Sequence, residues 1–179
     1  MYSRKIIRLD PKNYSGQTAI FVTLCCHRRR PHFSNHSVTN SILELLRDTA
    51  ASRDFAIHAY CFMPDHLHLL VEGISPSSDF LNFIKAFKLR SSRAFACNHH
   101  MPLWQDKFFE HILRRAESLE SVCLYIWANP IRAGLATALG DYPFAGSFTR
   151  QLLCSRSNRK PWCPPTSRGP LRKAGPTTN

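Results

Sequence analysis

The segment Tyr60–Glu72, which reads YCFMPDHLHLLVE, constrains the fold more than any other part of the chain, because it joins two strand-like runs through a proline-containing turn. Phe55–Phe62 is rich in residues that favour strands, Met63–Asp65 predicts a turn or bulge, and a second strand follows at once. Two strands with so short a connection pair in antiparallel fashion. Because side chains alternate between the faces of a strand, His66 and His68 project to one side, while the apolar side chains at the intervening odd-numbered positions enter a core.

Two imidazoles one strand repeat apart, on a strand that is anchored by its opposite face, form half of a site for a divalent cation. Partly exposed strand histidines without any chemical role give the same His-x-His pattern. The pattern by itself leaves both interpretations open, and a second feature further along the chain is needed to choose between them.

Hydrophobic periodicity predicts the remaining elements around this hairpin. Residues 18–26 predict a buried strand, residues 104–115 predict a last strand, and a third helix begins at Ser118 and is kinked or ended by Pro130. The expected N-caps are Ser37 or Thr39 for the first helix and Asp79 for the second. The residues expected to face the core are Val38, Ile42, Leu45, Leu46 and Thr49 on the first helix, Phe80, Phe83, Ile84 and Phe87 on the second, and Leu119, Val122, Cys123 and Ile126 on the third. The βαββαβ order predicts an α+β fold of the ferredoxin-like, RRM-like type: an antiparallel sheet with helices on one face, the other face free for a ligand, and an additional C-terminal helix.

The size and charge of the chain limit the classes of function. With 179 residues, of which 44% are apolar, we expect one domain over residues 1–149, with order fading from Gly140, followed by a basic, proline-rich flexible tail over residues 150–179. The net charge of +12 favours nucleic acid as a partner, ahead of an anionic membrane surface. No apolar run of about 18 residues and no secretory signal is present, so we expect no membrane association. The seven scattered cysteines suit buried thiols in a reducing cytosol.

Positive charge is concentrated on the second predicted helix, which follows the histidine strand closely in the sequence. We expect its basic side chains to bind DNA phosphates, although a merely solvated helix face has the same composition. The residues concerned are Lys85, Lys88, Arg90 and Arg93.

The third predicted helix carries the second feature. Tyr125 and Asn129 are four residues apart, so they lie on one side of the helix, one turn apart, at the border of its apolar stripe. At that border a polar tip can face a cleft. An interfacial tyrosine and a helix-terminal asparagine without function would occupy the same positions.

Three segments together resemble a known family: MPDHLHLL, WQDKFFEHILR and YIWANPIRAGL are similar to the single-tyrosine HUH transposases, most of all to the REP-associated tyrosine transposases and their insertion-sequence relatives. The resemblance covers about Phe21–Phe148, most of the chain. It implies that His66 and His68 are metal ligands and that Tyr125 is the nucleophile. It also implies that Asn129 is the third metal ligand, one turn after the tyrosine.

The resemblance extends to the second helix and to residues 104–115, which precede the third helix. Lys88 matches a basic residue that would contact phosphate. Asp65 stands where the family more often has Asn, and we expect its side chain to point away from the two histidines; Lys107 replaces a small residue or an arginine. Three residues match the family's segment before the catalytic helix without an assigned role: Trp104, Gln105 and His111.

The implied chemistry explains why these residue types occur together. A tyrosine hydroxyl has an ordinary pKa near 10 and becomes a competent nucleophile when a cation neutralises the scissile phosphate. Imidazole and amide ligands without thiolate suit Mg²⁺ or Mn²⁺. We therefore expect a transposase that acts on single-stranded or hairpin DNA through a 5′-phosphotyrosine, at the nucleoid of a bacterial cytosol, as a homodimer or a monomer. A rolling-circle initiator or relaxase, or a non-catalytic DNA-binding regulator derived from a transposase, are the alternatives.

Overall fold

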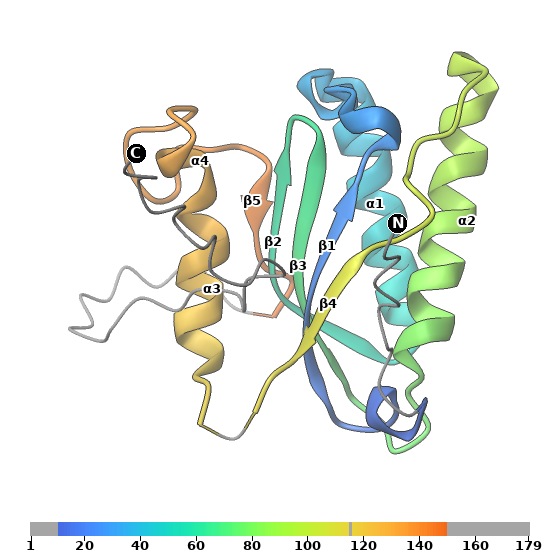
Figure 1. The fold of residues 1–179 in the computed structure, drawn as a ribbon, viewed down its shortest axis with the longest axis vertical. Helices are drawn as coiled ribbons and strands as arrows, with labels where there is room; N and C mark the ends of the chain where they lie inside the picture. The colour runs from blue at the N-terminus through green and yellow to red at the C-terminus, as the bar shows by residue number, and fades with distance from the viewer. Residues whose placement is uncertain (1–10, 115, 150–179) are drawn as a thin grey trace, which may run out of the picture.

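The computed structural model describes residues 11–114 and 116–149, which form a five-stranded antiparallel sheet with helices on both faces (Figure 1). In chain order the elements are η1 (Pro11–Tyr14), β1 (Ala19–Cys25), η2 (His27–Arg29), η3 (His32–Ser34), α1 (His36–Ser52), β2 (Phe55–Met63), β3 (His66–Gly73), α2 (Phe80–His99), β4 (Phe109–Ile112), α3 (Leu119–Trp127), α4 (Asn129–Arg132) and β5 (Ala145–Gly146). The strands lie in the order β4-β1-β3-β2-β5. The predicted βαββαβ order is therefore confirmed, and β5 extends the sheet beyond β2.

The predicted hairpin forms as β2 and β3. Met63 lies opposite His66, and the turn at Pro64–Asp65 connects the two strands. On its other edge β3 pairs with β1, where Cys25 lies opposite His66. Because β3 is hydrogen-bonded along both edges, the fold fixes the position of its histidines closely.

The main core lies between the sheet and the layer formed by α1 and α2. Leu67, Leu69 and Val71 of β3 are completely buried there, as the alternation of side chains predicts. Phe83 and Phe87 of α2 pack into the same cluster. The odd-numbered side chains of β3 thus belong to this core, and its even-numbered side chains belong to the opposite face.

The opposite face of the sheet is partly covered by α3, so the expectation of a free face is wrong beneath this helix (Figure 1). Val122 and Ile126 of α3 pack against Phe21 and Leu70 of the sheet in a second buried cluster. The reason is that Phe21 and Leu70 make this face apolar, and an apolar helix stripe is stable only where it is buried.

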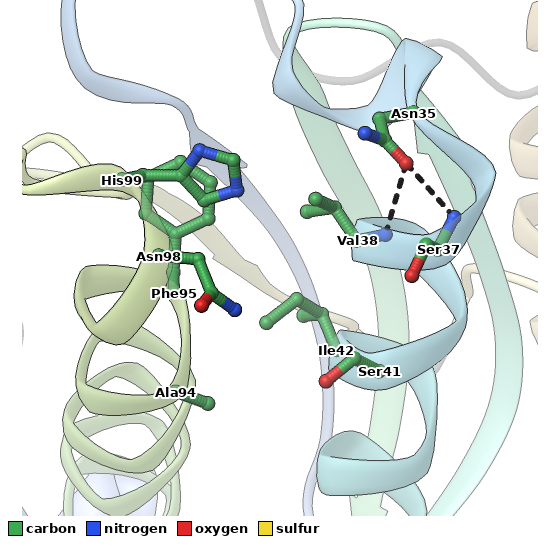
Figure 2. A pocket seen from close by; sticks show the side chains of 9 residues that line it. All are labelled: Asn35, Ser37, Val38, Ser41, Ile42, Ala94, Phe95, Asn98 and His99. Atoms are coloured by element: carbon green, nitrogen blue, oxygen red, sulfur yellow. Dashed lines mark hydrogen bonds between the residues drawn. The ribbon is translucent and has the colours of Figure 1, made fainter.

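The N-cap of α1 differs from the prediction. Asn35, rather than Ser37 or Thr39, caps the helix: its Oδ1 accepts hydrogen bonds from the backbone N–H groups of Ser37 and Val38 at 3.0 and 3.4 Å (Figure 2). Thr39 lies inside the helix, where its hydroxyl donates to the backbone carbonyl of Asn35 at 3.1 Å. The other two predicted N-caps are confirmed, namely Asp79 and Ser118.

The last predicted strand is much shorter than expected. Of the described residues in this range, 104–114, only Phe109–Ile112 form β4. Trp104 is instead buried beside α2, and its indole Nε1 donates to Ser91 Oγ at 2.8 Å. An aromatic residue that fills a core from a connector gives the same sequence pattern as a strand residue, which accounts for the error.

Order does not fade at Gly140. Phe144 is buried, and Ala145–Gly146 pairs with β2 as β5. The indole Nε1 of Trp127 donates to the carbonyl of Gly146 at 3.0 Å, which ties this segment to α3. The tail predicted over residues 150–179 lies outside the described residues. None of the described helices has the length and apolarity needed to cross a membrane.

Candidate metal and nucleophile site

His66 and His68 project from the middle of the sheet on the face that α3 shares, and their Nε2 atoms are 3.1 Å apart. The two rings are nearly perpendicular, with an angle of 85° between their planes. Two nitrogen ligands at about 2.1 Å from one ion, at a right angle, are separated by about 3.0 Å. The pair therefore fits a shared divalent cation; the same separation also fits an N–H···N hydrogen bond.

The other ring nitrogen of each histidine has a polar partner. Asp65 Oδ1 lies 2.5 Å from His66 Nδ1, and Thr23 Oγ1 lies 2.9 Å from His68 Nδ1. A carboxylate only accepts hydrogen bonds, so His66 donates from Nδ1 and keeps the lone pair of Nε2 free for a cation. Histidines that bind metals are oriented by partners of this kind.

The expectation that Asp65 points away from the histidines is wrong. Asp65 belongs to the turn before β3, where the alternation of strand side chains does not apply, and its carboxylate bridges His66 and Arg29. Its Oδ2 lies 3.3 Å from Arg29 Nη1. Burial opposes ionisation of this carboxyl, but the hydrogen bond from His66 and the charge of Arg29 keep its pKa below the ordinary value.

Burial keeps both imidazoles neutral, as metal ligation requires. It lowers the pKa of His68 to about 3, and the neighbouring His66, Arg132 and Arg29 contribute to this shift. Burial also lowers the pKa of His66, although the hydrogen bond to Asp65 acts in the opposite direction.

Tyr125 of α3 lies beside the histidine pair. Its ring centroid is 6.4 Å from that of His68 and 6.1 Å from that of Phe21, and both contacts are edge-on. One chain thus brings His66, His68 and Tyr125 together, although His68 and Tyr125 are 57 positions apart in the sequence.

Asn129 is the first residue of α4 and lies close to Tyr125. Its Nδ2 donates to the backbone carbonyls of Tyr125 and Ile126, each at 3.1 Å. The amide oxygen, which is the atom that would bind a cation, takes no part in these bonds. In the part of the chain that the structure describes, no group of three His, Cys, Asp or Glu side chains is arranged to hold a metal. The role of Asn129 as a third ligand stays a prediction.

Thiols close to the histidine pair are not ready metal ligands. Burial raises the pKa of Cys25, which lies opposite His66 on β1, and raises the pKa of Cys61 on β2 to about 12. Both thiols are therefore protonated at neutral pH.

The basic residues of α2 lie on the other side of the sheet from the histidine pair (Figure 1). Arg90 donates to the hydroxyl of Thr49 at 3.0 Å, and Lys88 donates to the backbone carbonyl of Gln105 at 2.7 Å. Gln105 in turn donates its backbone N–H to the carbonyl of Cys25 at 2.8 Å, so Lys88 contacts the segment that is hydrogen-bonded to the end of β1. The residues predicted to bind DNA on this helix are Lys85, Lys88, Arg90 and Arg93.

His111, which the sequence left without a role, lies on β4 opposite Phe21. Its Nε2 lies 2.8 Å from a carboxylate oxygen of Glu117, at the start of the segment that leads into α3. The pair therefore holds the connection between the sheet and the helix that carries Tyr125.

A separate hollow of about 220 Å³ lies between the beginning of α1 and the end of α2 (Figure 2). Asn35 and Ser41 line it from α1, and Asn98 and His99 line it from α2. It belongs to the α1–α2 side of the sheet and does not adjoin the histidine pair.

Comparison with known proteins identifies the family to which this chain belongs. Residues 15–129 match the family described as Transposase IS200 like, and the chain belongs to this family. The REP-associated tyrosine transposase of Escherichia coli (strain K12) is 26% identical over 106 residues, which are 59% of this chain and 60% of that protein. The chain therefore matches about three fifths of the length of this relative.

A second relative and a solved structure are also similar to this chain. A putative REP-associated tyrosine transposase of Haemophilus influenzae is 28% identical over 126 residues, or 63% of this chain and 70% of that protein. The solved structure of a REP-associated tyrosine transposase bound to a REP hairpin has a TM-score of 0.61, with 23% identity and 81% of each chain covered. It supports the fold described above.

Three residues around the site were not found from the sequence: Thr23, Arg29 and Arg132. Thr23 follows from the register of β1 and β3, which places it opposite His68. Arg132 Cζ lies 4.4 Å from the centroid of the Tyr125 ring, and its Nη2 donates to the Tyr125 carbonyl at 2.9 Å. Its spacing of seven residues from Tyr125, two helical turns, is a signal that was available in the sequence.

Proposed function

We propose that this protein is a metal-dependent tyrosine transposase that cleaves one strand of DNA and rejoins it by transesterification. The observation that carries the proposal is the convergence of two neutral imidazole Nε2 atoms, 3.1 Å apart, beside the ring of Tyr125. Membership of the IS200-like family favours a transposase over a rolling-circle initiator or relaxase that would use the same chemistry.

The proposed nucleophile is the hydroxyl oxygen of Tyr125. It attacks the scissile phosphorus, a bond forms between the phenolic oxygen and phosphorus, and the bond from phosphorus to the 3′ oxygen breaks. The phenol loses its proton and the departing 3′ oxygen gains one, so the products are a 5′-phosphotyrosine and a free 3′-hydroxyl. Attack by a 3′-hydroxyl on the phosphotyrosine reverses the step. Each step exchanges one phosphoester for another, so rejoining needs no ATP.

His66, His68 and the amide oxygen of Asn129 would hold Mg²⁺ or Mn²⁺, the ions that suit a neutral nitrogen and oxygen donor set. When bound, the cation neutralises negative charge on the scissile phosphate. Asp65 and Thr23 orient the two imidazoles through their Nδ1 atoms. The chain's own contribution is thus a rigid pair of ligands on β3 and a nucleophile on α3, a short distance apart.

The proposed substrate is single-stranded DNA next to a hairpin. The support for a hairpin is that the related solved structure is of a REP-associated tyrosine transposase bound to a REP hairpin. The basic residues of α2 would follow the backbone of flanking DNA on the other side of the sheet. Because Tyr125 lies beside His68 of the same chain, we propose that a monomer suffices for cleavage, which light scattering of the active protein would check.

The test is formation of a covalent adduct. The protein is incubated with Mn²⁺ and a labelled single strand taken from the DNA that flanks its gene, and the products are separated on a denaturing gel. Tyr125→Phe should abolish the adduct, and replacing His66 and His68 together by Ala should abolish cleavage while DNA binding persists. An adduct of undiminished yield with Tyr125→Phe would show that the nucleophile is another residue. No adduct from the unaltered protein would favour the DNA-binding regulator instead.

A further inference from the structure

The turn after β1 carries three consecutive arginines, and all three side chains are exposed: Arg28, Arg29 and Arg30. Arg28 and Arg29 have φ angles of 54° and 55°. This left-handed region is uncommon for residues other than glycine, and two such residues in succession are strained. Strain of this kind persists where the surrounding structure fixes it, and it is concentrated at functional sites.

Hydrogen bonds hold this turn against the turn that precedes β3. The backbone N–H of Cys26 donates to the carbonyl of Asp65 at 2.9 Å, and the N–H of Phe33 donates to the carbonyl of Pro64 at 3.0 Å. The N–H of His27 donates to the carbonyl of Leu103 at 2.8 Å. Because Asp65 is the residue before His66, these bonds fix the arginine turn relative to the histidine pair.

Two exposed guanidinium groups lie next to residues of the site, one beside Asp65 and one over the ring of Tyr125. From the turn, Arg29 lies 3.3 Å from Asp65, the partner of His66, and its side chain is 54% exposed. From α4, Arg132 is exposed and covers one face of the Tyr125 ring at 4.4 Å.

We propose that Arg29 and Arg132 form a clamp for the phosphates of a DNA single strand on the two sides of the scissile phosphate. The proposal rests on the proposed function, since it takes the histidine pair and Tyr125 to mark the reaction centre. Arginine suits this task because its planar guanidinium binds phosphate oxygens through two parallel hydrogen bonds. Asp65, bound to Arg29 at 3.3 Å, occupies one side of that guanidinium and leaves the rest exposed to a phosphate.

The clamp differs from a phosphate track along α2. Arg29 and Arg132 lie on the histidine side of the sheet, whereas Lys85 and Arg93 lie on the side of α1 and α2. A DNA single strand that passes the reaction centre meets Arg29 and Arg132 directly. The same DNA strand reaches α2 only if it continues around an edge of the β-sheet.

Salt-dependent binding to a fluorescein-labelled DNA single strand of mixed sequence distinguishes these possibilities. All measurements use the Tyr125→Phe protein, so that no cleavage occurs, and fluorescence anisotropy gives the association constant at several salt concentrations. For single strands, log K falls against log salt with a slope of about 0.7 per phosphate neutralised. We expect Arg29→Gln together with Arg132→Gln to reduce that slope by about 1.4, twice the single-contact value. Glutamine keeps a donor for the carbonyl of Tyr125, so the helix junction is preserved.

The matched control is Arg47→Gln together with Arg53→Gln, which removes the same charge from exposed positions of α1 and its C-cap. We expect a much smaller change of slope for this control. Restoring charge with Arg29→Lys and Arg132→Lys should restore the slope. An unchanged slope for the glutamine pair, or an equal loss for pair and control, overturns the clamp. A reduced salt dependence in the variant with Lys85→Gln and Arg93→Gln, in place of the variant with Arg29→Gln and Arg132→Gln, also overturns the clamp.

The outcome is independent of the covalent-adduct test. An adduct in the unaltered protein with an unchanged slope in the clamp variant would refute the clamp and leave the proposed function intact. A reduced slope without any adduct would refute the proposed cleavage while it supports phosphate binding by Arg29 and Arg132.

Discussion

The contact between Asp65 and His66 leads to a specific prediction for metal affinity. Asp65 Oδ1 lies 2.5 Å from His66 Nδ1, and this bond fixes the ring orientation and the tautomer that presents Nε2 to a cation. The perturbation is Asp65→Ala, which removes the acceptor, compared with Asp65→Asn, which keeps a neutral oxygen acceptor. Asp65 lies in a turn and its side chain is 30% exposed, so both variants should fold.

The expected magnitude follows from the geometry. Removing a partner that orients a metal-binding histidine weakens metal binding by about 10- to 100-fold. For Asp65→Ala we expect a loss of metal affinity near 100-fold, or about 2.8 kcal/mol of binding free energy. The reason is that the lost hydrogen bond is short and involves a carboxylate whose low pKa keeps it ionised. Asp65→Asn should fall near the lower end, since the amide oxygen still accepts from Nδ1.

The assay is titration of the Tyr125→Phe protein with Mn²⁺ in an isothermal calorimeter, without DNA. The tautomer of His66 is followed separately in metal-free protein by ¹⁵N NMR, a measurement that a general loss of stability does not mimic. Asp48→Ala, an exposed carboxylate on α1, is the matched control and should leave both measurements unchanged. If Asp65→Ala binds Mn²⁺ as tightly as the parent and His66 keeps its tautomer, the orienting role of Asp65 is refuted.

Three further predictions concern stability, measured by urea unfolding with a chelator present. The pKa of His68 is lowered from 6.5 to about 3, so between these pH values the unfolded chain binds a proton that the folded chain does not. The free energy of unfolding should therefore fall as the pH drops below about 6.5, by up to about 1.4 kcal/mol per pH unit from this group. His68→Gln should flatten that pH dependence. Asn35→Ala removes the N-cap of α1 and should cost about 1 kcal/mol, whereas Asn35→Asp should retain most of it; equal stability of the Ala variant would contradict the cap. Gly73→Ala should cost about 1–3 kcal/mol, because the added Cβ would meet the carbonyl oxygen of Gly16 at an impossible distance, and a neutral result would mean that this backbone contact relaxes freely.

Part of the site was predictable because its chemistry depends on local periodicity. The His-x-His alternation on a strand places both imidazoles on one face whatever the rest of the fold does, and the 3.6-residue period places Tyr125 and Asn129 one turn apart. The contact of Asp65 with His66 was predicted wrongly, because a turn residue follows neither period. The strand predicted over residues 104–115 was too long for a similar reason, since Trp104 has strand-like character but packs from a connector.

The sequence by itself determined the βαββαβ order and the core stripes, and it placed both histidines on one face of a strand, because these features follow from periodicity over short distances. Only the tertiary structure decided which residues of distant segments contact each other. Strand register places Thr23 opposite His68, the packing of α3 on the second face places Tyr125 beside that histidine, and hydrogen bonds between two turns bring Arg29 to Asp65. These contacts join segments far apart in the chain, and their energies depend on mutual burial, which no local pattern of residues records.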